Sequence, residues 1–531
     1  MNSGFFIRRL IVAMSFTLAI CAAHGVDKNS DDRVSGDFRF VEASINDVHR
    51  ALQGGDMSCV DLVTGYLRRI EQYDQPSGLN AVIFTNPAAI KKAASIDARL
   101  TSGDSLGPLF CIPVLLKDNF DTHDMPTSGG SVALKNSVPP DDAFMVKKLR
   151  AADAIVIAKT NMAEWAFSPK QTVSSSYGIT ANAYALNRVP AGSSGGTASA
   201  TAASFGVVGM GTDTGNSIRG PSSHLALFGI RSTMGLTSRD GVIPLAFDRD
   251  IAGPMTRTVE DAAKVFNVIA GFDAADRLTE LGKGRREADY TTFLNPNALR
   301  GKRIAVLRAL VDTEDADPEV IAVFEHALDD LVAQGAVLVD PFAVRNLDEH
   351  LEGDYFCSRF RYDMHVYLES LGEWAPIKDV MEVRSSGEYS PYIEGRLDYF
   401  GKYPRNIPPA KLDPPCPEFP NHPGRQAYLE DVVASMDAAQ VDVIVYPTWT
   451  NPPARLANAI EEYLGDNSQL LAPATGLPAV TVPMGYSHGG LPAGLQILGR
   501  PYSEGLLFSL AYAYEQATKH RRPPKGFPAI E

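Results

Sequence analysis

Apolar and polar residues along this chain follow two alternating patterns, one typical of helices and one of buried strands. Behind the capping sequence Ser58-Cys-Val-Asp61, apolar residues recur at helical spacing up to Ile70. The same spacing predicts a helix beginning at Thr258 and further helices at residues 87–100, 141–152, 195–205 and 318–334. Short apolar runs predict strands at residues 79–84, 113–117, 154–158, 207–211, 303–307, 336–339, 441–446 and 479–482. Strands that alternate with helices predict an α/β fold.

The first residues have the pattern of a leader sequence. Arg8 and Arg9 precede an apolar run at residues 10–23, and polar residues follow from Asp27. This order is typical of a secretory signal peptide, and the run is short for a membrane span. We therefore predict a signal peptide at residues 1–25, a mature domain at residues 37–525, and a secreted or periplasmic protein. Residues 18–21 also resemble a lipoprotein cleavage box, so lipid anchoring at Cys21 is a less favoured alternative.

Composition and charge exclude some classes of partner. The 531 residues are 45% hydrophobic and 21% charged, a balance that permits a large core. The formal net charge of −14 and the lack of a basic run argue against a nucleic-acid partner. After the leader, the sequence contains no segment long and apolar enough to span a membrane. No pattern determines the quaternary structure, for which a homodimer is one option.

Four cysteines follow the leader, namely Cys59, Cys111, Cys357 and Cys416. They are too widely spaced for a disulfide framework, so we expect buried free thiols, with one bridge between Cys357 and Cys416 as the alternative. The chain has no CxxC and no HExxH motif. The sequence therefore predicts neither a metal site nor a cofactor.

Candidate chemistry is concentrated in the stretch AGSSGGTASATAASFGVVGMGTDTGNSIR, residues 191–219. Its glycines surround paired hydroxyls and let the backbone approach a ligand closely. Such a composition also fits a linker, but the apolar residues 205–210 and the Asp213 and Arg219 pair are not typical of linkers. Ser193 and Ser194 lie near its start, and Ser217 follows Ser193 by 24 residues.

A lysine, Lys117, ends the apolar run at residues 113–117. In such a place a lysine can pack its stem and extend its ammonium to water. If the amine is buried instead, its pKa falls and the neutral form can act as a base. The residues on their own are compatible with both arrangements.

These features together resemble the amidase signature family, whose serine hydrolases use a lysine, a serine on a cis peptide bond and a nucleophilic serine. The separations of Lys117, Ser193 and Ser217 are similar to those of the family. The similarity extends to residues 126–131, 154–166, 474–500 and 511–518, and so covers residues 40–270 and 440–525. It implies a three-layer α/β/α fold around a large mixed sheet, with a signature core at residues 110–235.

The resemblance also implies a role for each catalytic residue. Ser217 is the expected nucleophile, and Ser193 is expected to take its proton and pass its own to neutral Lys117. The implied activity is that of a cofactor-free amidohydrolase that forms an acyl-Ser217 ester and releases an acid and an amine or ammonia. A small-molecule or peptide amide is the expected substrate.

Residues beside the nucleophile are expected to stabilise the reacting groups. The family resemblance assigns the oxyanion hole to the backbone N–H groups of Thr214, Gly215, Asn216 and Ser217. Asn216 stands where most members have glycine, and because asparagine tolerates a positive φ, we expect the turn to be kept. Ser194, Asp213 and Arg219 are expected to support it, with an ordinary surface ion pair as the alternative for the last two.

The similarity weakens at residues 346–425. Within this region, residues 403–423 include eight prolines, which exclude regular structure. We interpret residues 346–425 as a variable insertion that covers the substrate cleft. The loop at residues 122–140 is expected to form another wall, so substrate specificity would depend on these two regions.

Three other functions fit parts of the sequence less well. The sequence Gly192-Ser-Ser194-Gly-Gly196 satisfies the nucleophile motif of α/β-hydrolase esterases, with Ser194 as nucleophile, but the residues before it do not predict the strand that this motif needs. The amidase signature family also includes the glutaminase subunit of an amidotransferase acting on aminoacyl-tRNA, which an exported chain would not meet. A non-catalytic amide-binding protein is disfavoured because Lys117, Ser193 and Ser217 are all present.

Overall fold

A large mixed sheet forms the middle layer of the molecule. The computed structural model describes residues 38–530. The strands of the sheet are β1 (Val82–Thr85), β2 (Pro113–Lys117), β3 (Ile155–Thr160), β6 (Val208–Asp213), β7 (Phe228–Arg231), β8 (Ile251–Thr256), β9 (Arg303–Val306), β10 (Val337–Val339), β11 (Val443–Pro447), β12 (Ala479–Ser487) and β13 (Leu491–Leu498). They are ordered β1-β3-β2-β6-β8-β7-β12-β13-β11-β9-β10, and β4 (Val173–Ser174) with β5 (Gly178–Ile179) forms a separate hairpin.

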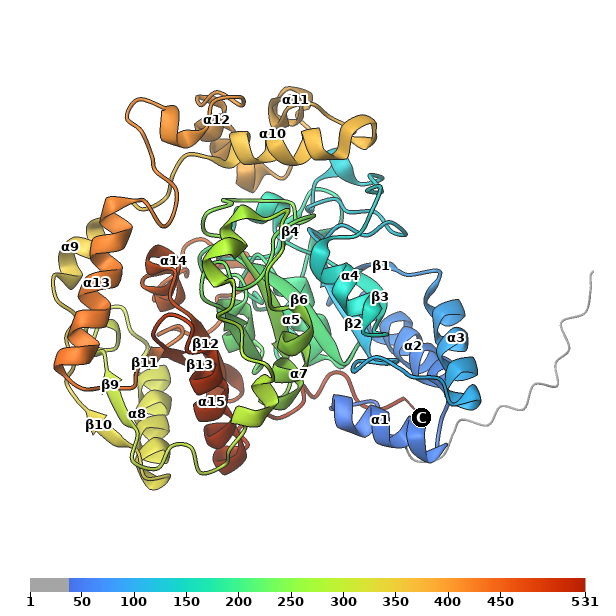
Figure 1. Cartoon of the computed structure of the whole chain (residues 1–531), viewed down its shortest axis with the longest axis horizontal. Coiled ribbons are helices and arrows are strands. Elements are labelled where there is room, and N and C mark those ends of the chain that lie inside the picture. The colour runs from blue at the N-terminus through green and yellow to red at the C-terminus, as the bar shows by residue number, and fades with distance from the viewer. Residues whose placement is uncertain (1–37, 531) are drawn as a thin grey trace, which may run out of the picture.

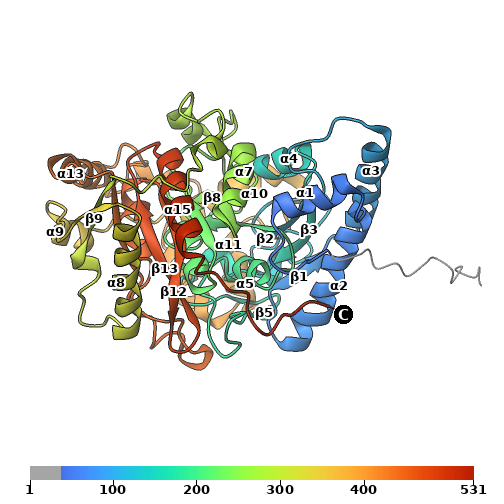
Figure 2. The ribbon, with the colours of Figure 1, turned by 90° about the horizontal axis from the view of Figure 1, so that it is seen from below.

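Helices lie on both sides of this sheet (Figure 1, Figure 2). In chain order they are α1 (Ile45–Gly54), α2 (Cys59–Ser77), α3 (Ala89–Ser102), α4 (Phe144–Ala151), α5 (Gly195–Ala202), α6 (Arg219–His224), α7 (Val259–Ile269), α8 (Pro318–Ala333), α9 (Leu347–Glu352), α10 (Phe360–Leu371), α11 (Val380–Ser386), α12 (Glu394–Gly401), α13 (Pro423–Ala438), α14 (Ala472–Thr475) and α15 (Glu504–Thr518). The predicted three-layer α/β/α architecture around a large mixed sheet is confirmed. Among the described residues, no helix is both long and apolar enough to cross a membrane.

The middle of the sheet is inaccessible to water on both faces. Strand β2 pairs in parallel with β3 and β6, and β6 pairs antiparallel with β8. Every residue of these four strands is buried. A strand covered on both faces has a continuous apolar run rather than an alternating one, which is why residues 113–117 and 154–158 were recognisable in the sequence.

Helix α5 packs closely against the sheet because its side chains are small. All of its residues are buried, and it contacts β2, β6 and β8. A Cβ atom on Gly196 would lie 2.2 Å from the carbonyl oxygen of Asn161, so this position accepts only glycine. The serines that precede α5 are thereby held against the ends of β2 and β6.

Residues 346–425 include four short helices, α9 to α12. Helices α10, α11 and α12 contact one another and lie together at the top of the molecule in Figure 1. Their apolar residues form a small core together with Leu134, Trp165, Phe167 and Ile243. Residues 403–423 contain a single 3₁₀ turn at Pro409–Lys411 before α13 begins, in keeping with their proline content.

All four cysteines of the described chain are paired, so the expectation of free thiols was wrong. Cys59 bonds to Cys111 and Cys357 bonds to Cys416. The Cys357–Cys416 bridge is the alternative that the sequence analysis named, whereas Cys59–Cys111, whose partners are 52 residues apart, was not expected. Only the fold brings the first residue of α2 beside the segment that leads into β2. The predicted leader, Cys21 included, lies outside the described residues.

We expect the two disulfides to differ in their resistance to reductant. Cys59 and Cys111 are fully buried, whereas Cys416 is partly exposed. Because exchange requires a thiolate to reach the sulfur atoms, dithiothreitol should reduce Cys357–Cys416 in the native protein and spare Cys59–Cys111. Alkylation followed by peptide mass spectrometry measures this difference. Labelling of Cys59 as fast as Cys416 in folded protein would contradict it.

Candidate active site

Lys117, at the end of β2, lies beside two hydroxyls. Its Nζ donates to Ser193 Oγ and to Thr212 Oγ1, each at 2.7 Å. Thr212 belongs to β6, the parallel neighbour of β2, and it also accepts a hydrogen bond from Asn119 Nδ2 at 3.1 Å. The pairing of the two strands therefore brings the predicted lysine to the predicted serine, and adds Thr212 and Asn119, which the sequence analysis missed.

The Lys117 amine has no path to water. Its side chain is fully buried, which excludes the arrangement in which the ammonium extends to solvent. Burial lowers the pKa of Lys117 from its ordinary value to about 7, and the carboxylates of Asp250 and Asp213 partly oppose this shift. Near neutral pH a substantial fraction of the amine is thus uncharged.

The loop that carries Ser193 and Ser194 is fixed to the end of β6. The peptide bond between Gly192 and Ser193 is cis, and both serines are fully buried. Ser194 Oγ donates to the carbonyl oxygen of Thr212 at 3.1 Å. Within the described residues no regular strand leads into this loop. Ser194 is therefore inaccessible and lacks the setting that an esterase nucleophile requires.

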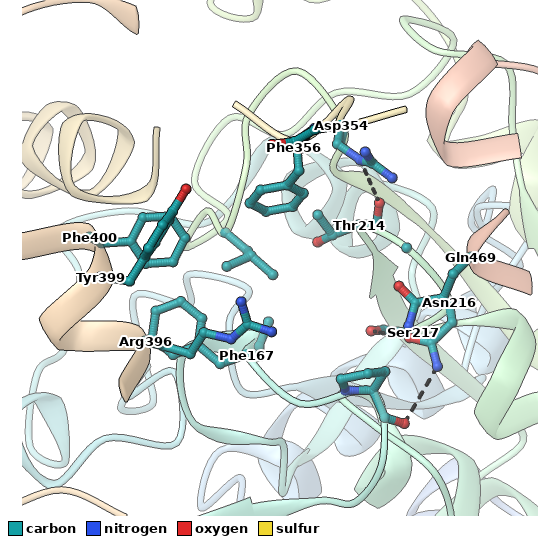
Figure 3. A pocket seen from close by; sticks show the side chains of 15 residues that line it. Phe167, Thr214, Asn216, Ser217, Asp354, Phe356, Arg396, Tyr399, Phe400 and Gln469 are labelled. Carbon is teal, nitrogen blue, oxygen red and sulfur yellow. Dashed lines mark hydrogen bonds between the residues drawn. The ribbon is translucent and has the colours of Figure 1, made fainter. Parts of the chain in front are cut away.

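Ser217 lies in the turn between β6 and α6 and is 5% exposed. Its Oγ donates to Asn216 Oδ1 at 3.1 Å, and in residues 38–530 no hydrogen bond joins it to Ser193. The Asn216 amide is itself held in place. Its Nδ2 donates to Asp466 Oδ2 at 3.0 Å and to the carbonyl oxygen of Pro169 at 3.5 Å (Figure 3). Asn216 thus connects the Ser217 hydroxyl to a half-buried carboxylate.

The turn does not depend on a left-handed residue. Neither Gly215 nor Asn216 has a positive φ, so the tolerance of asparagine for that conformation is not needed here. A Cβ atom at position 215 would lie 2.6 Å from Gln469 Oε1, so a larger residue there would displace the end of the Gln469 side chain. Across residues 38–530 no protein acceptor is hydrogen-bonded to the backbone N–H groups of Thr214, Gly215, Asn216 and Ser217.

Two arginines form ion pairs with Asp213, the residue that precedes the turn at residues 214–217. Arg219 Nε lies 3.1 Å from Asp213 Oδ2 and Arg231 Nη1 lies 3.0 Å from Oδ1, and none of the three side chains is exposed. Burial alone would raise the pKa of Asp213, but the two guanidinium groups hold it below its usual range. The surface ion pair considered for Asp213 and Arg219 is thus excluded. Arg231, on β7, could not be recognised from local spacing.

Ser217 opens into a pocket of about 360 Å³ (Figure 3). The turn at residues 214–217 forms one side with Gln469, and the opposite side comes from residues 346–425. The lining residues are Ala166, Phe167, Pro169, Thr214, Gly215, Asn216, Ser217, Leu245, Arg249, Asp354, Phe356, Arg396, Tyr399, Phe400 and Gln469.

Residues 122–140 contribute nothing to this lining, so the expectation that they form a wall was wrong. They fold back onto the residues after β2, where Gly129 N donates to the carbonyl oxygen of Asp118 at 3.0 Å. Ser128 Oγ also donates to the buried Asp118 carboxylate. The loop therefore supports the strand that holds Lys117 and does not itself line the pocket.

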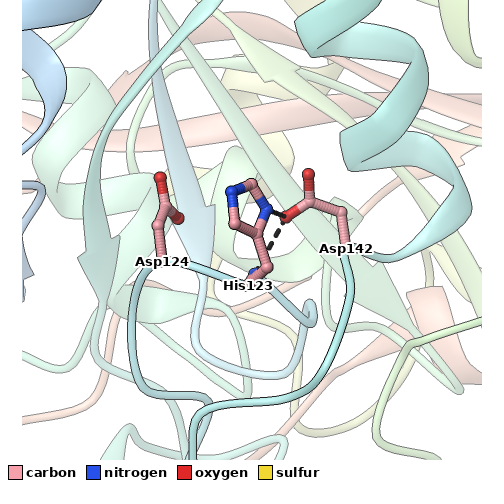
Figure 4. A group of neighbouring side chains, drawn as sticks. All are labelled: His123, Asp124 and Asp142. Atoms are coloured by element: carbon pink, nitrogen blue, oxygen red, sulfur yellow. Dashed lines mark hydrogen bonds and ion pairs between the residues drawn. The ribbon is translucent and has the colours of Figure 1, made fainter.

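A histidine and two carboxylates gather elsewhere, at His123, Asp124 and Asp142 (Figure 4). His123 Nδ1 lies 2.9 Å from Asp142 Oδ1. Arg150 pairs with both carboxylates, with Nη2 2.6 Å from Asp124 Oδ1 and Nε 3.0 Å from Asp142 Oδ2. Because a cation already balances this cluster, we assign it a structural role.

Comparison with known proteins agrees with this geometry. The model of the Amidase family matches residues 61–508. The peptide amidase of Stenotrophomonas maltophilia is 35% identical with a TM-score of 0.81, over 92% of this chain and 99% of that chain. A glutamyl-tRNA(Gln) amidotransferase subunit of Rippkaea orientalis is 33% identical over 499 residues, which cover 91% of this chain and 99% of that protein.

A structure of the corresponding amidotransferase subunit from Thermotoga maritima is 26% identical with a TM-score of 0.70, over 93% of this chain and 99% of that chain. The residues that match the family model include Lys117, Ser193 and Ser217 together with the elements that carry them. The chain belongs to the amidase signature family.

Proposed function

We propose that this chain is an exported serine amidohydrolase that cleaves carboxylic amides through an acyl-Ser217 ester. One observation carries the proposal: a fully buried lysine with a pKa near 7 contacts Ser193 directly behind the pocket that exposes Ser217. A buried amine without a paired carboxylate within hydrogen-bond distance is costly to fold. A catalytic need for the neutral amine as a base would explain why the chain buries Lys117 despite this cost.

In the first step the proton of Ser217 moves to the lysine through Ser193. The Ser217 hydroxyl turns from Asn216 towards Ser193 as Oγ attacks the substrate carbonyl carbon. Ser193 accepts the Ser217 proton and gives its own to the lone pair of Lys117, which becomes an ammonium. The carbonyl π electrons move to oxygen and form a tetrahedral oxyanion.

The N–H groups of Thr214, Gly215, Asn216 and Ser217 would receive the oxyanion. They have no protein acceptors in the described chain, and loss of one such donor costs about 3 kcal/mol of barrier in other hydrolases. The Asp213 ion pairs support this assignment, because Arg219 Nη2 donates to the carbonyl oxygen of Gly215 at 2.7 Å. Ser194 would hold the other side of the site through Thr212.

The relay then runs in reverse. Lys117 returns a proton through Ser193 to the leaving nitrogen, the carbon–nitrogen bond breaks, and the amine or ammonia departs. A water molecule then gives a proton to Ser193 and attacks the acyl-Ser217 carbonyl. The acid leaves and Ser217 regains its proton, so no cofactor or metal enters any step.

Two observations support export. The pattern at residues 1–25 is that of a signal peptide, and two disulfides are typical of an oxidising compartment. The peptide amidase similarity favours a peptide amide or related primary carboxamide as substrate. An independently acting hydrolase without a nucleic-acid partner agrees with the net charge of −14.

A glutaminase subunit of an amidotransferase is the second candidate. It is favoured by relatives named as subunits of glutamyl-tRNA(Gln) amidotransferase, which are 33% to 34% identical over 90% to 91% of this chain. The two functions are separated by assaying the purified chain alone on glutamine and on N-acetyl-phenylalaninamide. Preference for glutamine, or activity that requires further subunits, would favour the second.

A fluorophosphonate probe tests the nucleophile. Ser193, Ser194 and Ser217 share the tryptic peptide of residues 189–219, so fragmentation must locate the adduct. We expect it on Ser217, and we expect Lys117→Met to slow labelling by about 100-fold or more, since a general base contributes that much. Ser217→Ala is the negative control. An adduct on Ser194 would overturn the mechanism.

The rate should depend on the ionisation of Lys117. With a pKa of about 7, kcat/KM should fall as pH decreases and be about tenfold lower at pH 6 than on its plateau, because the ammonium cannot accept a proton. Burial also raises the pKa of Asp466 to about 6, so Asp466→Asn is the necessary control. If that variant loses the acidic limb, the limb belongs to Asp466.

Replacement of Asn216 by glycine tests how the nucleophile is positioned. Asn216→Gly removes both the acceptor of the Ser217 hydroxyl and the link to Asp466. We expect kcat to fall about tenfold with little change in KM, because small displacements of reacting groups are costly. Steady-state kinetics measures kcat and KM of this variant. The values are compared with those of Gln469→Glu, a nearby substitution that keeps the side-chain length. An undiminished kcat would show that Asn216 only packs.

A further inference from the structure

The pocket is lined by one arginine whose side chain has no hydrogen-bond partner among residues 38–530, the exposed Arg396. Arg396 lies on α12, and its guanidinium points into the cavity from the side opposite Ser217 (Figure 3). Within residues 38–530 its side chain makes no ion pair and no hydrogen bond. The N–H groups of an arginine without a partner at the wall of a binding cavity are free to donate hydrogen bonds to a carboxylate.

The other charged residues of the pocket are already engaged. Arg249 donates to the carbonyl oxygens of Thr214 and Tyr355, at 3.4 and 3.2 Å, and its guanidinium carbon lies 5.3 Å from the centre of the Phe356 ring. Asp354 Oδ1 accepts a hydrogen bond from Phe356 N at 3.1 Å. Two cations and one anion thus line the cavity, which is positive inside a chain of net charge −14.

The surface around Arg396 is apolar and aromatic. Phe167, Phe356, Phe400 and Leu245 line the same cavity, and the rings of Phe167 and Phe400 stack with centroids 5.6 Å apart. A low-dielectric wall strengthens the attraction of a cation for a carboxylate. The cavity therefore has an apolar surface for a ring or alkyl chain, and beyond it the guanidinium of Arg396, which has no protein partner in the described chain.

We propose that Arg396 selects amides whose acyl part carries a carboxylate beyond an apolar group. The acyl carbonyl would lie at Ser217, the apolar group against the aromatic wall, and the carboxylate at the guanidinium. This inference rests on the proposed hydrolase function and specifies the substrate class of that same site. Asp354 limits the preference, because its charge repels the same carboxylate.

Two amides that differ only by a carboxylate measure the effect of that charge on cleavage. N-succinyl-phenylalaninamide and N-butyryl-phenylalaninamide carry the same reacting primary amide and ring, and differ by a carboxylate in place of a methyl group. We expect wild-type kcat/KM to be about 10- to 100-fold higher for the succinyl compound, the range of a charge-assisted hydrogen bond. Chromatography of the N-acyl-phenylalanine product measures cleavage of the intended bond.

Variants of the charged residues test the assignment. Arg396→Gln should bring the ratio of the two kcat/KM values to about one, and Arg396→Lys should keep part of it because the charge remains. Asp354→Asn should raise the ratio several-fold. Lys402→Gln is the matched control, since Lys402 lies next to the end of α12 and does not line the pocket, and it should keep the wild-type ratio.

Binding to Ser217→Ala protein separates this inference from the hydrolase proposal. Calorimetry should give a Kd for the succinyl amide at least about tenfold below that for the butyryl amide, and Ser217→Ala/Arg396→Gln should abolish the difference. Equal Kd values, or a difference that survives Arg396→Gln, would overturn the role of Arg396. Selective binding without turnover by wild-type protein would instead overturn the hydrolase and leave Arg396 as a carboxylate-binding residue.

Discussion

Burial of the Lys117 amine against two hydroxyls is the constraint on which the rest of the site depends. An amine removed from water is tolerated only where its donors find partners, and Ser193 and Thr212 supply them at 2.7 Å each. Those partners come from two different elements, the serine loop and β6. The close packing of α5 against the sheet is what brings the loop within reach, and the small residues of that helix make the packing feasible.

Ion pairs, rather than an unusual backbone conformation, hold the turn at residues 214–217 in place. Asp213 is held between Arg219 and Arg231, and Arg219 also binds the carbonyl oxygen of Gly215. These contacts fix the chain on both sides of residues 214–217 without a positive φ within them. In the described chain the N–H groups of the turn are left without protein acceptors, and Asn216 is tied to Asp466. The site is thus held in place before a substrate enters.

The residues proposed for catalysis and those proposed for selectivity come from two parts of the chain. Every residue of the proposed proton relay belongs to β2, the serine loop or the turn after β6. The far side of the pocket comes from residues 354–400, which share an apolar core with Leu134, Trp165, Phe167 and Ile243, and a disulfide joins Cys357 to Cys416. The two parts thus come from different elements and pack against each other through that core.

The sequence by itself determined the α/β class and the buried strands, because continuous apolar runs are local patterns. It pointed to Lys117, Ser193 and Ser217 as catalytic candidates through the resemblance to the amidase signature family. It did not reveal Thr212, Arg231, Asp466 or Arg396, since each reaches the site from an element whose position depends on strand order and packing. Local spacing also misplaced residues 122–140, which support β2 instead of lining the pocket. The Cys59–Cys111 pair was missed for the same reason, because residues 52 positions apart come together only when the sheet has formed, whereas Cys357–Cys416 had been named as an alternative to free thiols.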